Sequence, residues 1–172
     1  EARPGASDRG YFLARRAALR SLVGLQTARC GEDVLIGYDA PGAPRVKEPE
    51  GIYVSVSGRS ALAALAVANL PVGVDIEICG ANVEIIEDVL HDDERKWLST
   101  CPPNAQKDEF LRIWTAKEAY LKALGAGLNI DPATVAVRLS GNAVTAIRHN
   151  GKVISQTGRL SENWFDGVKV IA

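Results

Sequence analysis

The chain has 172 residues, of which 47% are hydrophobic and 24% charged, and its formal net charge at pH 7 is -1. These are ordinary values for a soluble globular protein, and the balanced charge excludes a general basic field that would attract nucleic acid. The three cysteines, Cys30, Cys79 and Cys101, form neither a disulfide framework nor a Cys-x-x-Cys zinc site, which favours a reducing cytoplasm. The longest apolar stretch is too short to span a bilayer, so we expect no membrane partner.

Hydrophobic periodicity predicts an α+β protein. Residues 60–68 fit either a strand or an alanine-rich helix, and their periodicity does not decide between the two. Predicted helices cover residues 11–25, 82–90, 93–98 and 109–124, and predicted strands cover 52–57, 72–78, 135–139, 144–148, 153–156 and 168–171. The helix 109–124 is expected to end at Gly125, as helix C-termini often do.

Two acidic residues, Asp75 and Glu77, lie two positions apart on the predicted strand 72–78. Alternate residues of a strand point to the same face, so the two carboxylates are expected to sit together. Their like charges raise both pKa values unless a cation intervenes, and Mg²⁺ is usually held by one or two carboxylates plus substrate phosphates. Short motifs occur by chance, so a pair of solvated acids on an edge strand stays open as an alternative.

The predicted helix 109–124 carries Glu118 and Lys122 on one face, because they are four residues apart. Taken alone, such a pair is most often a surface ion pair that contributes only a few tenths of a kcal/mol. Two other side chains, Glu94 and Trp97, each fit a structural as well as a functional role. Glu94 is either a third acid near a metal or a helix-start residue favoured by the dipole, and Trp97 fits a core anchor better than an adenine platform.

Together the two motifs resemble the bipartite signature of the 4'-phosphopantetheinyl transferase superfamily. The strand G-[IV]-D-x-E of that signature matches Gly73 to Glu77, and its helix W-[ST]-x-K-E-[AS]-x-x-K matches Trp114 to Lys122. Residues 14–22 and 54–58 are also similar to the first helix and the S-H-S-G strand of the Sfp-type branch.

The resemblance implies a fold of two pseudo-symmetric lobes, residues 1–70 and 71–172, each a small, mainly antiparallel sheet packed on a long helix. It also implies a cytoplasmic monomer that moves 4'-phosphopantetheine from coenzyme A to a serine of an apo acyl or peptidyl carrier protein. Mg²⁺ would be the cofactor, 3',5'-ADP the leaving product, and carrier docking transient. Which carrier or pathway is served stays open.

Residue by residue, the resemblance assigns the metal to Asp75, Glu77 and Glu118. Glu118 would also take the proton from the carrier serine, directly or through a water molecule. Lys122 would stabilise the phosphates during transfer. The expected coenzyme A contacts are Arg16, Arg20, Arg45, Ser55, Lys117 and Lys122.

Two positions depart from the family pattern: the histidine of S-H-S is Val56 here, and the lysine of G-K-P is Ala43. Both normally meet phosphates of coenzyme A, and a hydrogen bond from a charged group contributes about 1.5–3 kcal/mol. Arg45, Lys47 and Arg59 are close enough in sequence to compensate. One alternative is therefore a transferase-fold paralogue that binds a carrier protein or coenzyme A-like ligand without this transfer. Another is a metal-dependent phosphate-binding domain of different function.

Overall fold

The computed structural model describes residues 6–39, 42–80, 83–125, 129–141, 143–154, 158–159, 162–165 and 168–171. Within these residues the chain is a mixed α/β protein of three α-helices and small antiparallel sheets, which agrees with the predicted class. In the part of the chain described, no helix has both the length and the apolar character that crossing a membrane requires.

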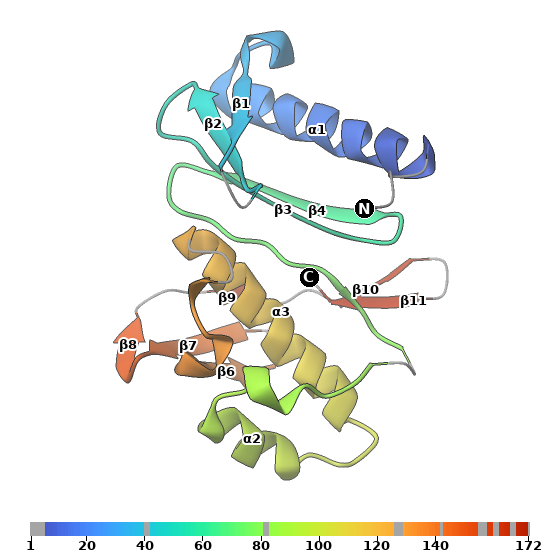
Figure 1. The fold of residues 1–172 in the computed structure, drawn as a ribbon, viewed down its shortest axis with the longest axis vertical. Coiled ribbons are helices and arrows are strands. Elements are labelled where there is room, and N and C mark those ends of the chain that lie inside the picture. Colours follow the sequence, from blue (N-terminus) through green and yellow to red (C-terminus); the bar gives the residue numbers. More distant parts are fainter. Residues whose placement is uncertain are drawn as a thin grey trace.

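The N-terminal part packs one long helix over two hairpins (Figure 1). Apolar residues at helical spacing give this helix a buried face: Leu19 and Val23 meet Val34 and Ile36 in a small hydrophobic cluster. The elements are α1 (Ala6–Thr27), a 3-10 turn (Gly31–Asp33), β1 (Leu35–Tyr38), β2 (Pro44–Glu48), β3 (Tyr53–Arg59) and β4 (Leu62–Ala68). β1 pairs with β2 and β3 with β4, both antiparallel.

The C-terminal part builds two further sheets around the helix α3 (Gln106–Leu124), which packs against β6 (Val135–Ser140). One sheet has the order β6-β7-β8 with β9 also on β7, and the other has the order β10-β11-β5. The remaining elements are β5 (Glu77–Ile78), η2 (Glu87–Val89), α2 (Asp92–Ser99), η4 (Pro132–Thr134), β7 (Ala143–His149), β8 (Lys152–Ile154), β9 (Gly158–Arg159), β10 (Glu162–Phe165) and β11 (Val168–Ile171).

This part has its own hydrophobic cluster, separate from that of the N-terminal part. Phe110, Ile113 and Leu121 of α3 pack there with Val135 and Ile147 of the neighbouring sheet. The described residues thus form two hydrophobic clusters, one on each side of the linker that follows β4. A division at residue 70 and a pseudo-symmetry between the two parts stay predictions.

The structure decides one open alternative and changes two expectations. Within residues 60–68, which fitted a strand or a helix, Leu62–Ala68 form the strand β4, with Arg59 paired to Leu62 and Tyr53 to Ala68. The predicted helix 82–90 is wrong: residues 83–86 form neither helix nor strand, and Glu87–Val89 form only the 3-10 turn η2. Val83 and Ile85 pack alternately against the C-terminal cluster, and residue 82 lies outside the described residues. The predicted strand 72–78 is reduced to the short β5, which pairs with β11.

Candidate active site

The linker that follows β4 crosses α3 at very close range. A Cβ at Gly73 would lie 1.7 Å from the carbonyl oxygen of Ala119 and 2.7 Å from the backbone nitrogen of Ala123. Glycine is required here because the two backbones approach too closely for any side chain. The crossing explains why residues 71–76 form no ladder, and it brings Asp75 to the last turns of α3.

Asp75 is buried, with 5% of its surface exposed. Its Oδ1 atom accepts hydrogen bonds from Lys122 Nζ at 2.6 Å and from Ser57 Oγ at 2.7 Å. Its Oδ2 atom is buried and finds no hydrogen-bond partner among the described residues. A buried carboxylate oxygen without a partner is costly, so this atom offers a vacant ligand position for a cation.

Glu77 is held by Arg59 in a two-point ion pair. Arg59 Nε lies 2.8 Å from Glu77 Oε2, and Arg59 Nη2 lies 2.5 Å from Glu77 Oε1. The hydrogen bond to Glu77 is the main cause that raises the pKa of Arg59. Ser57 and Arg59 are two apart on β3, as Asp75 and Glu77 are on the facing segment, so both carboxylates reach the same face of β3.

Glu118 is half-buried on α3, and burial is the main cause that raises its pKa. The negative charges of Asp75 and Glu77 raise the pKa of Glu118 further, whereas Lys122 and Arg59 lower it. The three acidic groups therefore share one electrostatic neighbourhood.

The donor set suits a divalent cation, although the carboxyl groups are not gathered around a point. Within the described ranges, no three His, Cys, Asp or Glu side chains lie close enough together to hold an ion. Asp75 has a free buried oxygen, and Glu118 is a carboxyl group whose ionisation a cation would favour. Both oxygens of Glu77 are occupied by Arg59, so Glu77 could join a metal only if Arg59 moved.

A pocket of about 360 Å³ adjoins these carboxylates. It is bounded by α1, the β1–β2 hairpin, β3 and the end of α3, and the described residues that line it include the cations Arg15, Arg16, Arg45 and Lys122 but no acidic residue. Lys122 belongs to both places, because it lines the pocket and donates to Asp75. A concave site with four cations and no carboxylate suits an anionic ligand.

Two of these cations are fixed by neighbouring side chains. The guanidinium carbon of Arg16 lies 4.7 Å from the ring centroid of Tyr38 and 5.2 Å from that of Phe12, within the range of cation–π attraction. Arg45 Nε lies 3.0 Å from Asp39 Oδ2. Both guanidinium groups are therefore pre-oriented at the pocket.

Some of the predicted coenzyme A contacts line the pocket, and others do not. Ser55 lines the pocket with Arg16, Arg45 and Lys122; its hydroxyl accepts from Val74 N at 3.1 Å and can still donate its own proton. Arg20 is not among the lining residues, because it lies one helical turn further along α1, where its carbonyl faces Gly31.

The prediction that Lys117 contacts coenzyme A requires a correction. Its side chain is fully buried, and its Nζ atom lies 2.6 Å from Glu94 Oε2 and donates to the carbonyl oxygens of Val89 at 2.7 Å and Pro132 at 3.0 Å. Burial lowers the pKa of Lys117, which the pairing with Glu94 opposes. An ammonium group has three donors, and all three are used, so Lys117 does not bind the phosphates of a ligand.

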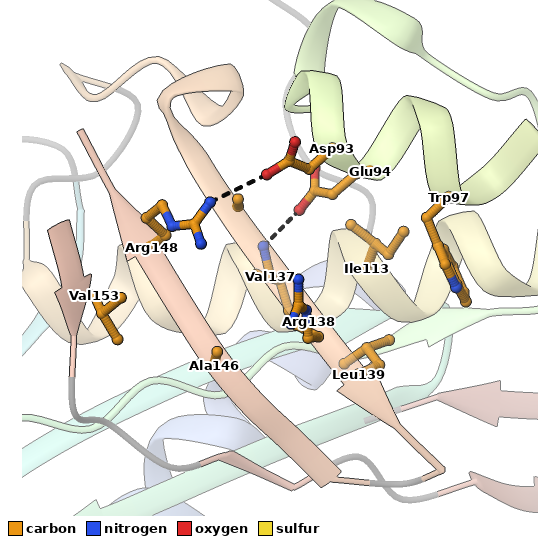
Figure 2. A pocket seen from close by; sticks show the side chains of 11 residues that line it. Asp93, Glu94, Trp97, Ile113, Val137, Arg138, Leu139, Ala146, Arg148 and Val153 are labelled. Carbon is orange, nitrogen blue, oxygen red and sulfur yellow. Dashed lines mark hydrogen bonds and ion pairs between the residues drawn. The ribbon is translucent and has the colours of Figure 1, made fainter. Parts of the chain in front are cut away.

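Glu94 has a structural role. Its Oε2 accepts from the backbone of His91 at 2.8 Å in a capping box that starts α2, and its Oε1 accepts from Val137 N at 2.7 Å on β6. Figure 2 shows a second cavity beside this contact, in which Asp93 pairs with Arg148 at 3.2 Å. Trp97 forms a wall of that cavity and is 42% exposed, so it is not a core anchor. None of the residues that the resemblance assigns to the metal or to coenzyme A lines this second cavity.

Ser57 and Arg15 were not predicted as site residues, and Arg59 binds Glu77 instead of compensating for a phosphate contact. The alternation on β3 contained a signal, because Ser55, Ser57 and Arg59 occupy every second position of a strand whose other face is apolar. Such a polar face predicts partners across it. Arg15 could not be found this way, since one helix carries several arginines and only tertiary packing distinguishes them.

Comparisons with known proteins find matches to one family. A family model described as the 4'-phosphopantetheinyl transferase superfamily matches residues 71–164. The chain is 35% identical over 100 residues to 4'-phosphopantetheinyl transferase gsp of Aneurinibacillus migulanus, which covers 58% of this chain and 41% of that protein. It is 28% identical over 166 residues to 4'-phosphopantetheinyl transferase psf-1 of Bacillus pumilus, covering 90% of this chain and 71% of that protein. A 4'-phosphopantetheinyl transferase of Bacillus subtilis is 27% identical over 139 residues, 80% of this chain and 60% of that protein. The match to gsp, the highest in identity of these, thus spans less than half of that relative's length.

Proposed function

Since the chain belongs to the 4'-phosphopantetheinyl transferase superfamily, we propose that it transfers the 4'-phosphopantetheine group of coenzyme A to a serine of an apo acyl or peptidyl carrier protein. The observation that carries this proposal is the double position of Lys122, which lines the cationic pocket and donates to Asp75 at 2.6 Å. Transfer from a diphosphate needs cations for the phosphates beside carboxylates for a metal ion and a proton. Lys122 joins these two requirements in one site.

The pocket supplies the contacts for coenzyme A. Arg16, Arg45 and Lys122 bind its phosphates through charge-assisted hydrogen bonds, and Ser55 donates one more. Because Arg16 already lies against the rings of Phe12 and Tyr38, less conformational freedom is lost when the ligand binds.

Mg²⁺ is the proposed cofactor, with Asp75 and Glu118 as its ligands and Glu77 as a further one when Arg59 releases it. When bound, this ion neutralises the charge that develops on the diphosphate. The support is the unpartnered Oδ2 atom of Asp75 and the raised pKa of Glu118.

Glu118 acts as the proton acceptor. A carboxylate with a raised pKa is a stronger base, and it must be ionised to act. The carrier serine oxygen attacks the β-phosphorus as its proton passes to Glu118, the bond from that phosphorus to the bridging oxygen breaks, and 3',5'-ADP leaves. Lys122 stabilises the negative charge that the leaving phosphate gains.

The alternative of a paralogue without transfer rests on one observation: Ala43 and Val56 both line the pocket and carry no charge. We favour transfer because the same lining provides four other cations. A carrier that docks transiently fits a monomer, and three cysteines that form no disulfide with one another fit a reducing cytoplasm; we propose both.

The test is the intact mass of an apo carrier protein after incubation with the chain, coenzyme A and Mg²⁺. We expect the carrier to gain one phosphopantetheine, and a carrier with its acceptor serine replaced by alanine to gain nothing. Carrier binding without mass gain would indicate the paralogue. Binding of the metal with neither result would indicate a phosphate-binding domain of different function.

A further inference from the structure

We propose that Arg15 is a phosphate-binding residue for coenzyme A and that it supplies, from α1, the positive charge that Val56 and Ala43 do not provide. This inference rests on the proposed function and names a ligand contact that the resemblance does not assign. It depends on four features of Arg15: its place in the pocket, its support, its lack of a carboxylate partner and its position beside β3.

Arg15 reaches from α1 across to β3. It lines the same pocket as Val56 and Ser55. A Cβ at Gly58 would lie 2.6 Å from Arg15 Nη1, so the missing side chain of Gly58 leaves the space that the guanidinium group occupies. Gly58 is two positions after Val56, which places this cation on β3 next to the position where the family pattern has histidine.

Tyr11 supports Arg15 from one side. The guanidinium carbon of Arg15 lies 4.8 Å from the centroid of the Tyr11 ring, and the Tyr11 hydroxyl donates to the carbonyl oxygen of Leu62 on β4. The ring is thereby tied to the β3–β4 hairpin, and the cation is stacked on it. Arg15 is held in place before a ligand arrives.

No carboxylate neutralises Arg15 within the described part of the chain. Its Nε atom is buried and has no hydrogen-bond partner there, and the pocket that it lines contains no acidic residue. Arg59, by contrast, donates from both Nε and Nη2 to Glu77. A planar fork of donors in a cationic pocket, with one buried donor vacant, is suited to a phosphate group.

The first experiment measures the dissociation constant of coenzyme A by isothermal titration calorimetry, without carrier protein. Arg15→Gln is expected to weaken binding by about 10- to 100-fold, the range for losing one charge-assisted contact. Arg29→Gln is the matched control, because Arg29 is exposed two residues beyond the C-terminal end of α1 and lies outside the pocket. Equal affinities for Arg15→Gln and the control would overturn the proposal.

Two further variants separate ligand binding from a merely structural role. Gly58→Ala moves the guanidinium group of Arg15 but does not remove its charge, so this variant should also weaken coenzyme A binding. Val56→His added to Arg15→Gln should recover part of the lost affinity at about pH 6, where a histidine is largely protonated, because it places a cation on β3 close to the site that the Arg15 guanidinium group occupied. If Arg15→Gln weakens binding but neither variant behaves in this way, the loss is due to altered folding and the proposal is wrong.

The outcome is separable from that of the proposed function. If Arg15 binds coenzyme A, Arg15→Gln should raise KM for coenzyme A in the carrier mass assay and leave kcat nearly unchanged. A wild-type chain that modifies no carrier contradicts the transferase, whereas an active wild type with an unchanged KM in Arg15→Gln contradicts the role of Arg15 alone.

Discussion

Glu118 carries an electrostatic cost in the metal-free protein. Burial, Asp75 and Glu77 raise its pKa above the ordinary 4.5, which means that folding favours the protonated form. Its contribution to stability is therefore present at low pH and is lost as pH rises through the folded-state pKa. At neutral pH the ionised group opposes folding, and a bound cation would relieve this.

Glu118→Gln is accordingly expected to raise the Tm at pH 7 in EDTA while it abolishes transfer. The gain should shrink as pH falls below the pKa of Glu118, because wild-type Glu118 is then also neutral. Thermal melts over a series of pH values check this. A lower Tm for the variant at pH 7 would show that ionised Glu118 does not destabilise the metal-free fold.

Arg59 would compete with a metal ion for Glu77, because it occupies both carboxylate oxygens. Arg59→Gln should lower stability in EDTA by about 1–3 kcal/mol, since it leaves a buried charge with weaker partners. The same variant should gain more Tm from added Mg²⁺ than the wild type does. Equal Mg²⁺-induced shifts in the two proteins would rule out the competition.

At the scale of elements, the crossing of the linker over α3 sets the site. Gly73→Ala would place a Cβ 1.7 Å from the Ala119 carbonyl and push the linker away from α3, which separates Asp75 from Lys122. We expect a stability loss of about 1–3 kcal/mol and a transfer rate at least about tenfold lower. Gly80→Ala is the control, because nothing lies within 4 Å of a Cβ at that position. Similar behaviour of the two variants in melts and transfer assays would contradict the crossing.

The buried pair Lys117–Glu94 joins three elements: α3, α2 and β6. Lys117→Met leaves Glu94 charged and buried, which should cost about 3–5 kcal/mol in the free energy of unfolding. Adding Glu94→Leu should recover part of that loss, which denaturant unfolding can measure. Because Lys117 meets no ligand phosphate, the folded fraction of Lys117→Met should keep its KM for coenzyme A. A large rise in this KM would restore Lys117 as a ligand-binding residue.

Local patterns predicted the elements whose partners are nearby and missed those that depend on distant ones. The helices α1, α2 and α3 follow from apolar spacing, and α3 ends at Gly125 in the left-handed region as expected. The β1–β2 hairpin was not predicted, because β2 consists mostly of charged residues and proline. The strand 72–78 was overextended, since Val74 N bonds to the Ser55 hydroxyl in place of a strand partner.

At the scale of the whole molecule, the candidate site is formed by residues from both the N-terminal and the C-terminal part. The N-terminal part supplies Arg16, Arg45 and Ser55, and the C-terminal part supplies Lys122 and Glu118. The motifs in the sequence indicated most of these residues, because they are local patterns. They could not show which cations reach the pocket, and for this reason Lys117 was wrongly included and Arg15 was not selected.

The joining of pocket and carboxylates into one transfer site is tested most directly by the intact mass of an apo carrier after incubation with coenzyme A, Mg²⁺ and either wild type or Asp75→Asn. Asp75→Asn keeps the shape of the side chain and removes the charge that holds Lys122 and would hold the ion. We predict that the carrier gains one phosphopantetheine with the wild type and none with the variant. Circular dichroism should show that both proteins are folded. Equal modification of the carrier by the two proteins would contradict the account.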